Sequence, residues 1–194
     1  MNLIENIKTA SEIAERCQRN WDLSKTIPEE EIELLKTVIR NSPSKQNEEF
    51  YSVMFITDRD TIEKIYQTTT YDGKQRSDYN KNPQVLANLL IVFFEIIPNT
   101  VRNFGSLDAI EQEKNRNMAI GIASGELILT AAMLGLKTGF CLCFNSEEVK
   151  QVIGEVPLLT IGVGYPDTTK DRRIHHKVGK QFATFNKTTK FKVI

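Results

Sequence analysis

The chain has 194 residues, of which 40% are hydrophobic and 26% are charged, with 25 basic and 25 acidic side chains. This length and composition fit one globular domain with a buried core. A formal net charge of zero argues against general binding of nucleic acids or anionic membranes, because both kinds of binding depend on a basic excess. Three cysteines do not form a disulfide framework.

The first twenty residues contain Glu5, Glu12 and Glu15 and lack an unbroken apolar core, so they do not resemble a signal peptide. Every long apolar run is interrupted by Gly, Ser or Glu before it reaches the length that spans a bilayer. We therefore expect a cytoplasmic protein.

The first half of the chain predicts helices and one strand. Apolar residues at helical spacing predict a helix over residues 3–17. Pro28 and the three glutamates after it predict the start of a second helix, which ends before Asn41 because Pro43 follows closely. Residues 50–57 predict a strand and residues 58–66 a short helix. The polar segment 68–82 predicts a surface loop or an irregular helix.

The second half predicts two buried strands around a long apolar helix. Residues 85–97 contain LLIVFFEII and predict a buried strand, with a loop over residues 98–106. Residues 108–117 predict the first turns of the central helix. Ser146 predicts the cap of a helix that ends near Gly154. Residues 157–165 predict a second buried strand, and residues 191–194 are a candidate last strand that pairs with a partner subunit.

The most informative stretch covers residues 118–145. Only Glu126 is charged between Met118 and Leu136, and a helix that is apolar on all faces is a buried helix. Gly135 predicts its end, followed by a turn over residues 137–139 and a strand over residues 140–144. The stretch fits a core helix that feeds a buried strand. The alternative is that the same unit forms the floor of a cofactor site or a subunit interface.

Standard catalytic patterns are missing: the sequence has no Walker loop, no GxGxxG after a strand, no GxSxG and no paired metal-ligand motif. We interpret His175 and His176 as solvated residues beside a basic tail. Cys141 and Cys143 form a CxC pair on one face of a predicted strand. We interpret them as small buried apolar side chains, with redox chemistry as the alternative.

Two basic clusters are candidates for anion binding. Arg16 and Arg19 follow the first helix, and a second cluster of Lys170, Arg172 and Arg173 follows the last main strand. Arginine pairs phosphates through a planar fork of donors, so the clusters gain meaning if they meet at one phosphate. A solvated face is the alternative for each cluster. The segment SPSKQN, residues 42–47, adds a proline-fixed loop with short polar side chains.

Taken in order, these pieces resemble the nitroreductase family of flavoproteins. The resemblance starts with the arginine turn and the aromatic residue after it, residues 16–22. It continues through the proline-started acidic helix, the SPSKQN segment and a strand that ends in Thr-Asp. The family's late helix of the type LaAxxlGLgt matches residues 129–138, its iGyP strand end matches residues 161–166, and its basic segment matches residues 171–173. No single motif is specific, but their order covers nearly the whole chain.

The resemblance implies one α+β domain over residues 1–194, with a central, mostly antiparallel sheet flanked by helices, in an intertwined homodimer. It implies FMN as the cofactor, at two sites in the subunit interface, and NADH or NADPH as the electron donor. A small-molecule acceptor, such as a nitroaromatic or a quinone, would be reduced in a ping-pong cycle. No nucleic-acid or membrane partner is expected. The flavin would carry the chemistry itself, so no catalytic side chain is expected.

The resemblance also implies particular flavin contacts. Arg16 and Arg19 would contact FMN from the first turn, with Arg19 the candidate cation near the pyrimidine ring. The SPSKQN loop would reach the flavin from the second subunit, and Arg173, with Arg172, would bind the phosphate. The complete set of expected contacts is Arg16, Cys17, Gln18, Arg19, Pro43, Ser44, Lys45, Asn47, Asn80, Cys141, Arg172 and Arg173.

Two alternatives stay open within this resemblance. One is a specialised relative, such as a flavin-fragmenting benzimidazole synthase or a dehalogenase, for which residues 68–82 are the candidate lid. The other is a flavin-binding protein without turnover.

Overall fold

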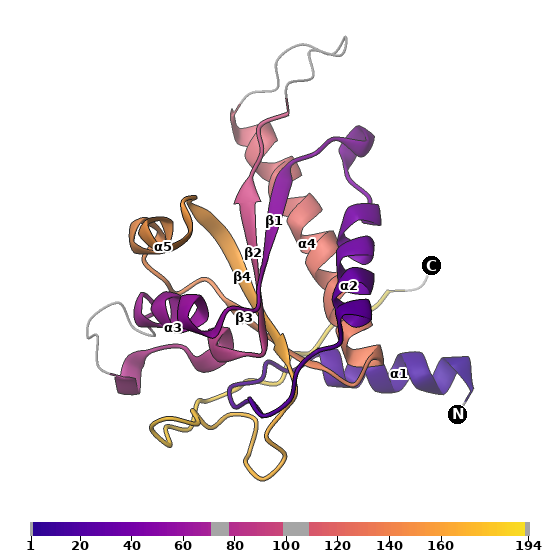
Figure 1. Cartoon of the computed structure of the whole chain (residues 1–194). Coiled ribbons are helices and arrows are strands. Elements are labelled where there is room, and N and C mark those ends of the chain that lie inside the picture. Colours follow the sequence, from indigo (N-terminus) through magenta and orange to yellow (C-terminus); the bar gives the residue numbers. More distant parts are fainter. Residues whose placement is uncertain (1, 71–77, 99–108, 193–194) are drawn as a thin grey trace.

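The computed structural model describes residues 2–70, 78–98 and 109–192. Within these ranges the strands form one antiparallel sheet with the order β1-β2-β4-β3 (Figure 1). The strands are β1 (Tyr51–Ile56), β2 (Leu89–Glu95), β3 (Lys137–Cys141) and β4 (Pro157–Gly164). This arrangement confirms the α+β class and the antiparallel sheet that the sequence predicts.

Both faces of the sheet are covered, which explains why β2 is apolar along almost its whole length. Leu89, Ile91 and Phe93 pack against α2 (Glu29–Asn41) and α4 (Ala109–Met133). The alternate residues Leu90 and Val92 pack in a second core that contains residues of α3 (Arg59–Gln67) and α5 (Ser146–Ile153). Successive side chains of a strand point to opposite faces, so one strand serves both cores. Figure 1 shows α2 and α4 on one side of the sheet and α3 and α5 on the other.

The long helix α4 is a single element of 25 residues. It joins the predicted first turns over residues 108–117 to the apolar helix after them. Gly135 follows its end with a φ of 80°, a left-handed conformation that glycine adopts without steric cost. The chain therefore reverses at once, and Lys137 already pairs with Gly164. The expected turn at residues 137–139 is thus part of β3, and the strand expected at residues 140–144 starts and ends earlier.

The N-terminal helices agree with the prediction except at their ends. Helix α1 (Leu3–Ala14) ends three residues before the predicted end. Helix α2 includes Asn41, and Pro28 is its N-cap. The cap of α5 is Asn145, whose side chain accepts hydrogen bonds from the backbone N–H groups of Glu147 and Glu148, so the prediction of Ser146 was wrong by one residue.

Three short 3₁₀ helices replace parts of the predicted loops and strands. They are η1 (Lys45–Asn47), η2 (Asp78–Asn80) and η3 (Pro83–Leu86). The strand predicted over residues 85–97 therefore begins only at Leu89, because η3 is buried and apolar like a strand but is capped by Asn82. Most of the loop predicted over residues 98–106 lies outside the described residues. Phe191 and Lys192 form no strand, and the rest of that candidate strand is not described.

Candidate functional site

The arginine turn, residues 16–19, is fixed between β3 and the segment that follows β4. The backbone N–H of Gln18 donates to the carbonyl oxygen of Thr138 at 2.8 Å, and that of Arg19 donates to the carbonyl oxygen of Arg172 at 3.0 Å. The turn lies so close to β3 that a Cβ atom at Gly139 would stand 2.8 Å from the carbonyl oxygen of Gln18. Two segments more than 150 residues apart therefore meet, as expected if both basic clusters served one site.

Three cations line a cavity of about 460 Å³ beside this turn. They are Arg16, Lys137 and Arg172, and the carboxylates of Glu12 and Glu15 line the same cavity. Nη1 of Arg172 donates to the carbonyl oxygen of Cys17 at 3.3 Å. Burial, and then the charge of Arg16, lower the pKa of Arg172, and burial lowers the pKa of Lys137. Arg172 and Lys137 are partly desolvated, and the exposed Arg16 lies close to Arg172, an arrangement that suits an anion.

Arg172 and Arg173 have different surroundings although both belong to the expected phosphate contact. Arg173 makes a bidentate pair with Asp171, with Nε–Oδ1 and Nη2–Oδ2 distances of 2.9 and 2.6 Å. This pair holds the pKa of the Asp171 carboxyl well below its usual range. Arg172 thus lines the same cavity as Arg16, whereas the guanidinium of Arg173 is paired with the carboxylate of Asp171.

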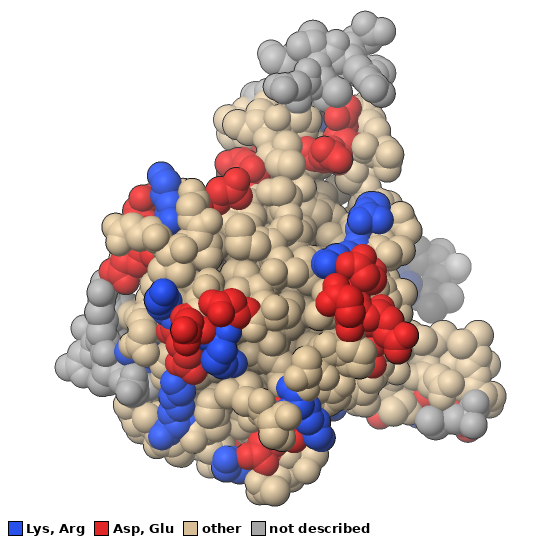
Figure 2. Space-filling model, in the orientation of Figure 1, with Lys and Arg blue, Asp and Glu red and all other residues tan. Residues whose placement is uncertain are grey.

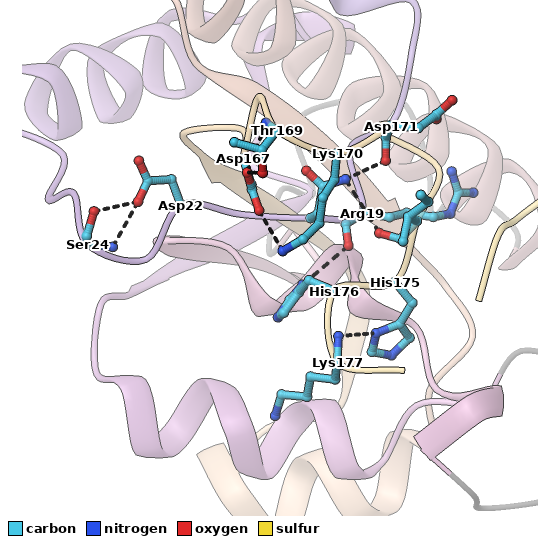
Figure 3. Close-up of polar contacts among 12 residues, drawn as sticks. Arg19, Asp22, Ser24, Asp167, Thr169, Lys170, Asp171, His175, His176 and Lys177 are labelled. Atoms are coloured by element: carbon cyan, nitrogen blue, oxygen red, sulfur yellow. Dashed lines mark hydrogen bonds and ion pairs between the residues drawn. The ribbon is translucent and has the colours of Figure 1, made fainter. Parts of the chain in front are cut away.

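The segment after β4 covers the arginine turn from one side (Figure 3). Nδ1 of His176 lies 3.4 Å from the carbonyl oxygen of Arg19, and Nζ of Lys170 pairs with the carboxylate of Asp167 at 2.7 Å. Lys170 therefore does not join Arg172 at the cavity.

His175 is completely buried, which corrects the expectation of a solvated residue. Its Nδ1 accepts a hydrogen bond from the backbone N–H of Lys177 at 3.2 Å, and its Nε2 lies 2.9 Å from the hydroxyl of Tyr66. His176 is also largely covered, and burial lowers its pKa. His175 anchors the C-terminal segment to α3 through Tyr66, and His176 anchors it to the arginine turn, roles that no local sequence pattern reveals.

A second cavity, of about 330 Å³, lies beside Arg19. Its lining combines the cation of Arg19 with the amides of Asn82 and Gln84, and the guanidinium of Arg19 stacks 4.8 Å from the ring centre of Phe182. Cys143 lines this cavity, whereas Cys141 is buried and is not part of the lining. Asn80, an expected contact, instead accepts a hydrogen bond from Lys180 at 3.2 Å. The complete lining is Arg19, Asn82, Gln84, Phe140, Leu142, Cys143 and Phe182.

A third cavity, of about 380 Å³, runs along the small residues of α4. Gly121 and Gly125 line it, and Ser124 presents a buried hydroxyl that has no hydrogen-bond partner within the described residues. Phe140 and Leu142 line both this cavity and the one beside Arg19. Together the two cavities form a surface with one cationic end and one smooth apolar end.

The SPSKQN loop lies at the other end of α2, away from the arginine turn (Figure 1). Gln46 and Asn47 both have left-handed φ values, 56° and 58°, which are unusual for residues other than glycine. Ser44 donates to the carbonyl oxygen of Glu48, and Lys45 pairs with Glu111 at 2.8 Å. Within one chain, Pro43, Ser44, Lys45 and Asn47 are therefore not brought to the cavity of Arg16.

Glu126, the lone charge in the apolar part of α4, is bonded to the start of this loop. The hydroxyl oxygen of Ser42 lies 2.5 Å from its Oε2 and 2.9 Å from the carbonyl oxygen of Val38, and the single hydroxyl hydrogen is shared between these two acceptors. The carboxylate thus ties α4 to the SPSKQN loop.

The charged surface is mixed rather than basic. In the face shown in Figure 2, lysines and arginines alternate with acidic side chains, including the acidic first turn of α2. None of the helices in the described ranges is long and apolar enough to cross a membrane. In the same ranges no group of three or more His, Cys, Asp or Glu side chains is placed to hold a metal ion.

The architecture is that of the nitroreductase fold. A nitroreductase family protein from Clostridium novyi superposes with a TM-score of 0.63 and 17% identity, over 94% of this chain and 97% of that one. A nitroreductase-like protein from Exiguobacterium sibiricum, solved in complex with FMN, gives a TM-score of 0.66 at 16% identity, over 86% and 89%. A candidate NAD(P)H:FMN oxidoreductase from Staphylococcus epidermidis gives 0.67 at 16%, over 86% and 90%.

These likenesses confirm the resemblance to nitroreductases at the level of the fold. No protein-family model matches the sequence, and no curated protein matches it either. The fold alone does not define an activity.

The sequence did not single out several residues of these cavities. Asn82, Gln84 and Phe182 join the linings although they belong to no expected motif. Lys137 lines the cavity of Arg16 and belongs to the stretch, residues 129–138, that resembles the family's late helix, but it was not among the expected contacts.

Proposed function

We propose that this chain is an FMN-dependent oxidoreductase, which uses NADH or NADPH to reduce nitroaromatic, quinone or similar acceptors by a ping-pong mechanism. The observation that carries the proposal is the meeting of Arg16, Lys137 and Arg172 around one cavity. These residues come from three distant segments, and a phosphate is the anion that such a set of donors suits best.

The residues present fit FMN at both of its ends. Arg16, Lys137 and Arg172 would hold the phosphate, and the smooth wall of Gly121, Gly125 and Phe140 would face the flat ring. Arg19 would place a cation near the pyrimidine edge, as the resemblance implies. The buried hydroxyl of Ser124 would gain a polar partner there.

When bound, FMN supplies the acceptance of a hydride from the nicotinamide and its delivery to the acceptor. The protein's own part is to bind, orient and shield. The backbone bonds of Gln18 and Arg19 fix the arginine turn before any ligand arrives, so little ordering remains to be done on binding.

The dimer is part of the proposal. The SPSKQN loop lies too far along α2 to complete the site of its own chain, so we infer that Pro43, Ser44, Lys45 and Asn47 act at the site of the partner subunit. The exposed apolar residues Met118, Ile122 and Met133 of α4 would form the interface. We keep the cytoplasm as the expected compartment, with no nucleic-acid or membrane partner.

An absorption spectrum of the purified protein, followed by titration with FMN, tests the cofactor. Bleaching by NADH or NADPH under anaerobic conditions, reversed by a quinone, tests turnover. A colourless protein that takes up no added FMN would overturn the proposal. Binding of FMN without bleaching by either nicotinamide would favour the alternative of a non-catalytic flavin-binding protein.

The specialised alternatives, flavin fragmentation or dehalogenation, are tested with the same preparation. Loss of the flavin spectrum during aerobic turnover would indicate fragmentation. Halide release from a halogenated phenol would indicate a dehalogenase.

A further inference from the structure

Two thiols meet where β3 ends. The Sγ atoms of Cys141 and Cys143 are 3.5 Å apart, and both side chains face the core that contains α3 and α5. The side-chain amide of Asn82 donates to Sγ of Cys143 at 3.1 Å. Since no disulfide joins the two residues, the pair is a dithiol at near-contact distance.

The surroundings shift the pKa values of the two thiols in opposite directions. Cys143 receives hydrogen bonds from the thiol of Cys141 and the amide of Asn82, and the cation of Arg19 lies nearby, so its pKa is lowered to about 6. The hydrogen bond to Cys143, and then burial, raise the pKa of Cys141. These shifts favour the thiolate at Cys143 and the protonated thiol at Cys141.

The two sulfur atoms also differ in their exposure to the cavity. Cys143 lines the cavity beside Arg19, whereas only 1% of Cys141 is exposed. A small oxidant in the cavity reaches Cys143 first. Cys141, whose Sγ lies 3.5 Å from that of Cys143, is then placed to attack whatever forms on its neighbour.

We propose that Cys141 and Cys143 form a reversible redox pair, in which Cys143 attacks a small peroxide and Cys141 resolves the product as a disulfide. In the first step the Cys143 thiolate attacks one oxygen of hydrogen peroxide, the O–O bond breaks, and the leaving hydroxide takes a proton to give water and a sulfenic acid. In the second step the Cys141 thiol attacks that sulfur, the S–O bond breaks, and a second water leaves with the Cys141 proton.

The two steps balance, because two thiols lose two hydrogen atoms and one peroxide becomes two waters. The disulfide would be easy to reduce again. Residues two apart in an extended chain have Cα atoms about 6.6–6.8 Å apart, at the upper end of the range that disulfides tolerate. Such strained bonds are the reducible ones.

The pair belongs to the same cavity as Arg19, so its state changes the charge there. Formation of the disulfide removes the thiolate that faces the guanidinium. The chemistry of the pair itself is independent of the proposed flavin activity, and it is tested without nicotinamide.

Peptide mapping of the full-length protein tests the pair. The reduced protein is treated with hydrogen peroxide at neutral pH and digested with trypsin, which places both cysteines in the peptide of residues 138–150 and Cys17 alone in the peptide of residues 17–19. We expect the first peptide to lose two hydrogen atoms and to regain them with dithiothreitol. Its oxidation should be about 10-fold faster than that of Cys17, because the pKa of Cys143 is lowered to about 6 and a second thiol lies 3.5 Å away to resolve the product.

Two variants separate the roles. In Cys141→Ser, Cys143 should give a sulfenic acid that dimedone traps, and then a sulfinic acid, with no disulfide. In Cys143→Ser, Cys141 should keep its thiol at the same dose of peroxide. The wild-type map needs neither variant, so a folding defect in either one leaves the test intact.

Three outcomes would overturn the proposal. They are persistence of both thiols while Cys17 is oxidised, a sulfinic acid at Cys143 of the wild type with Cys141 still free, and a disulfide that joins two chains.

Discussion

Arg172 and Arg173 are neighbours in sequence, yet their guanidinium groups have different partners. Arg172 lies beside Arg16 and Lys137 at one cavity, while Arg173 is held by Asp171. The resemblance favoured Arg173 for the phosphate, and the surroundings now favour Arg172. Adjacent residues in a loop point in different directions, so sequence spacing could not decide between them.

This difference gives a paired prediction. Arg172→Ala should weaken FMN binding by about 10- to 100-fold, since a hydrogen bond to a charged group is worth about 1.5–3 kcal/mol. Arg173→Ala should weaken it by less than about threefold. Fluorescence titration of the apoprotein with FMN measures both. Equal losses of FMN affinity in the two variants would contradict the different roles of Arg172 and Arg173. No loss in either variant would contradict the proposed phosphate site.

The thiolate of Cys143 has a measurable pH dependence. The pKa of about 6 predicts that its alkylation by iodoacetamide is slow in acid, rises through a midpoint near pH 6, and is constant above it, because only the deprotonated form reacts. The groups that face it are the cation of Arg19, the amide of Asn82 and the thiol of Cys141. Mass spectrometry of the peptide of residues 138–150 follows the reaction. The peptide that contains Cys17 serves as an internal reference.

The variant Asn82→Asp tests whether the side-chain amide of Asn82 stabilises the thiolate of Cys143. The carboxylate keeps the oxygen that accepts the backbone N–H of Gln84, so the cap of η3 survives. It replaces the N–H donor to Cys143 by a negative charge, which disfavours the thiolate and should move the midpoint up by about one pH unit or more. An unchanged midpoint would mean that Asn82 does not stabilise the thiolate.

At the scale of elements, the hydrophobic pattern predicted most helices and strands but not their junctions. The apolar second half of α4 and the run in β2 could be predicted, because long apolar stretches mark packed elements. The expectation that α4 is buried on all faces was wrong for the single chain, since Gly121, Ile122 and Gly125 are exposed. The boundaries of β3 and η3 could not be predicted. The pairing of β3 with β4 and the capping of η3 by Asn82 determine them. The buried His175 was missed for the same reason: its partner Tyr66 is 109 residues away.

Gly139 shows how an element junction supports the site. A Cβ atom there would lie 2.8 Å from the carbonyl oxygen of Gln18 and 2.9 Å from Cβ of Gln84, so either β3 or the arginine turn has to move. Gly139→Ala should lower the free energy of unfolding by about 1–3 kcal/mol. Urea denaturation measures it. FMN binding should fall as well, because Gln18 holds the turn; a variant as stable as the wild type would refute the close approach.

At the scale of the whole molecule, the single chain gathers only part of the expected site. Arg16, Arg19 and Arg172 meet, whereas Pro43, Ser44, Lys45 and Asn47 lie at the far end of α2. The resemblance assigns the loop to a second subunit, and that assignment stays a prediction. Residue patterns alone could not have done so, because no periodicity in one chain records which copy a loop reaches.

The exposed face of α4 provides the test of that assembly. Ile122, in the apolar half of α4, is 39% exposed in the single chain, and Val156, in the turn between α5 and β4 on the other side of the sheet, is 42% exposed. If α4 forms the interface, Ile122→Lys buries an unpaired charge there and should weaken dimerisation by at least about 100-fold. Val156→Lys adds the same charge at similar exposure and should leave the dimer intact.

Sedimentation equilibrium measures the association of both variants, and FMN titration is run on the same samples. Because the loop of one chain is proposed to complete the site of the other, Ile122→Lys should lose FMN affinity as it dissociates, and high protein concentration should restore both together. A monomeric wild type would contradict the dimer directly. A monomeric variant that binds FMN like the wild type would instead show that one chain suffices, and would remove the SPSKQN loop from the site.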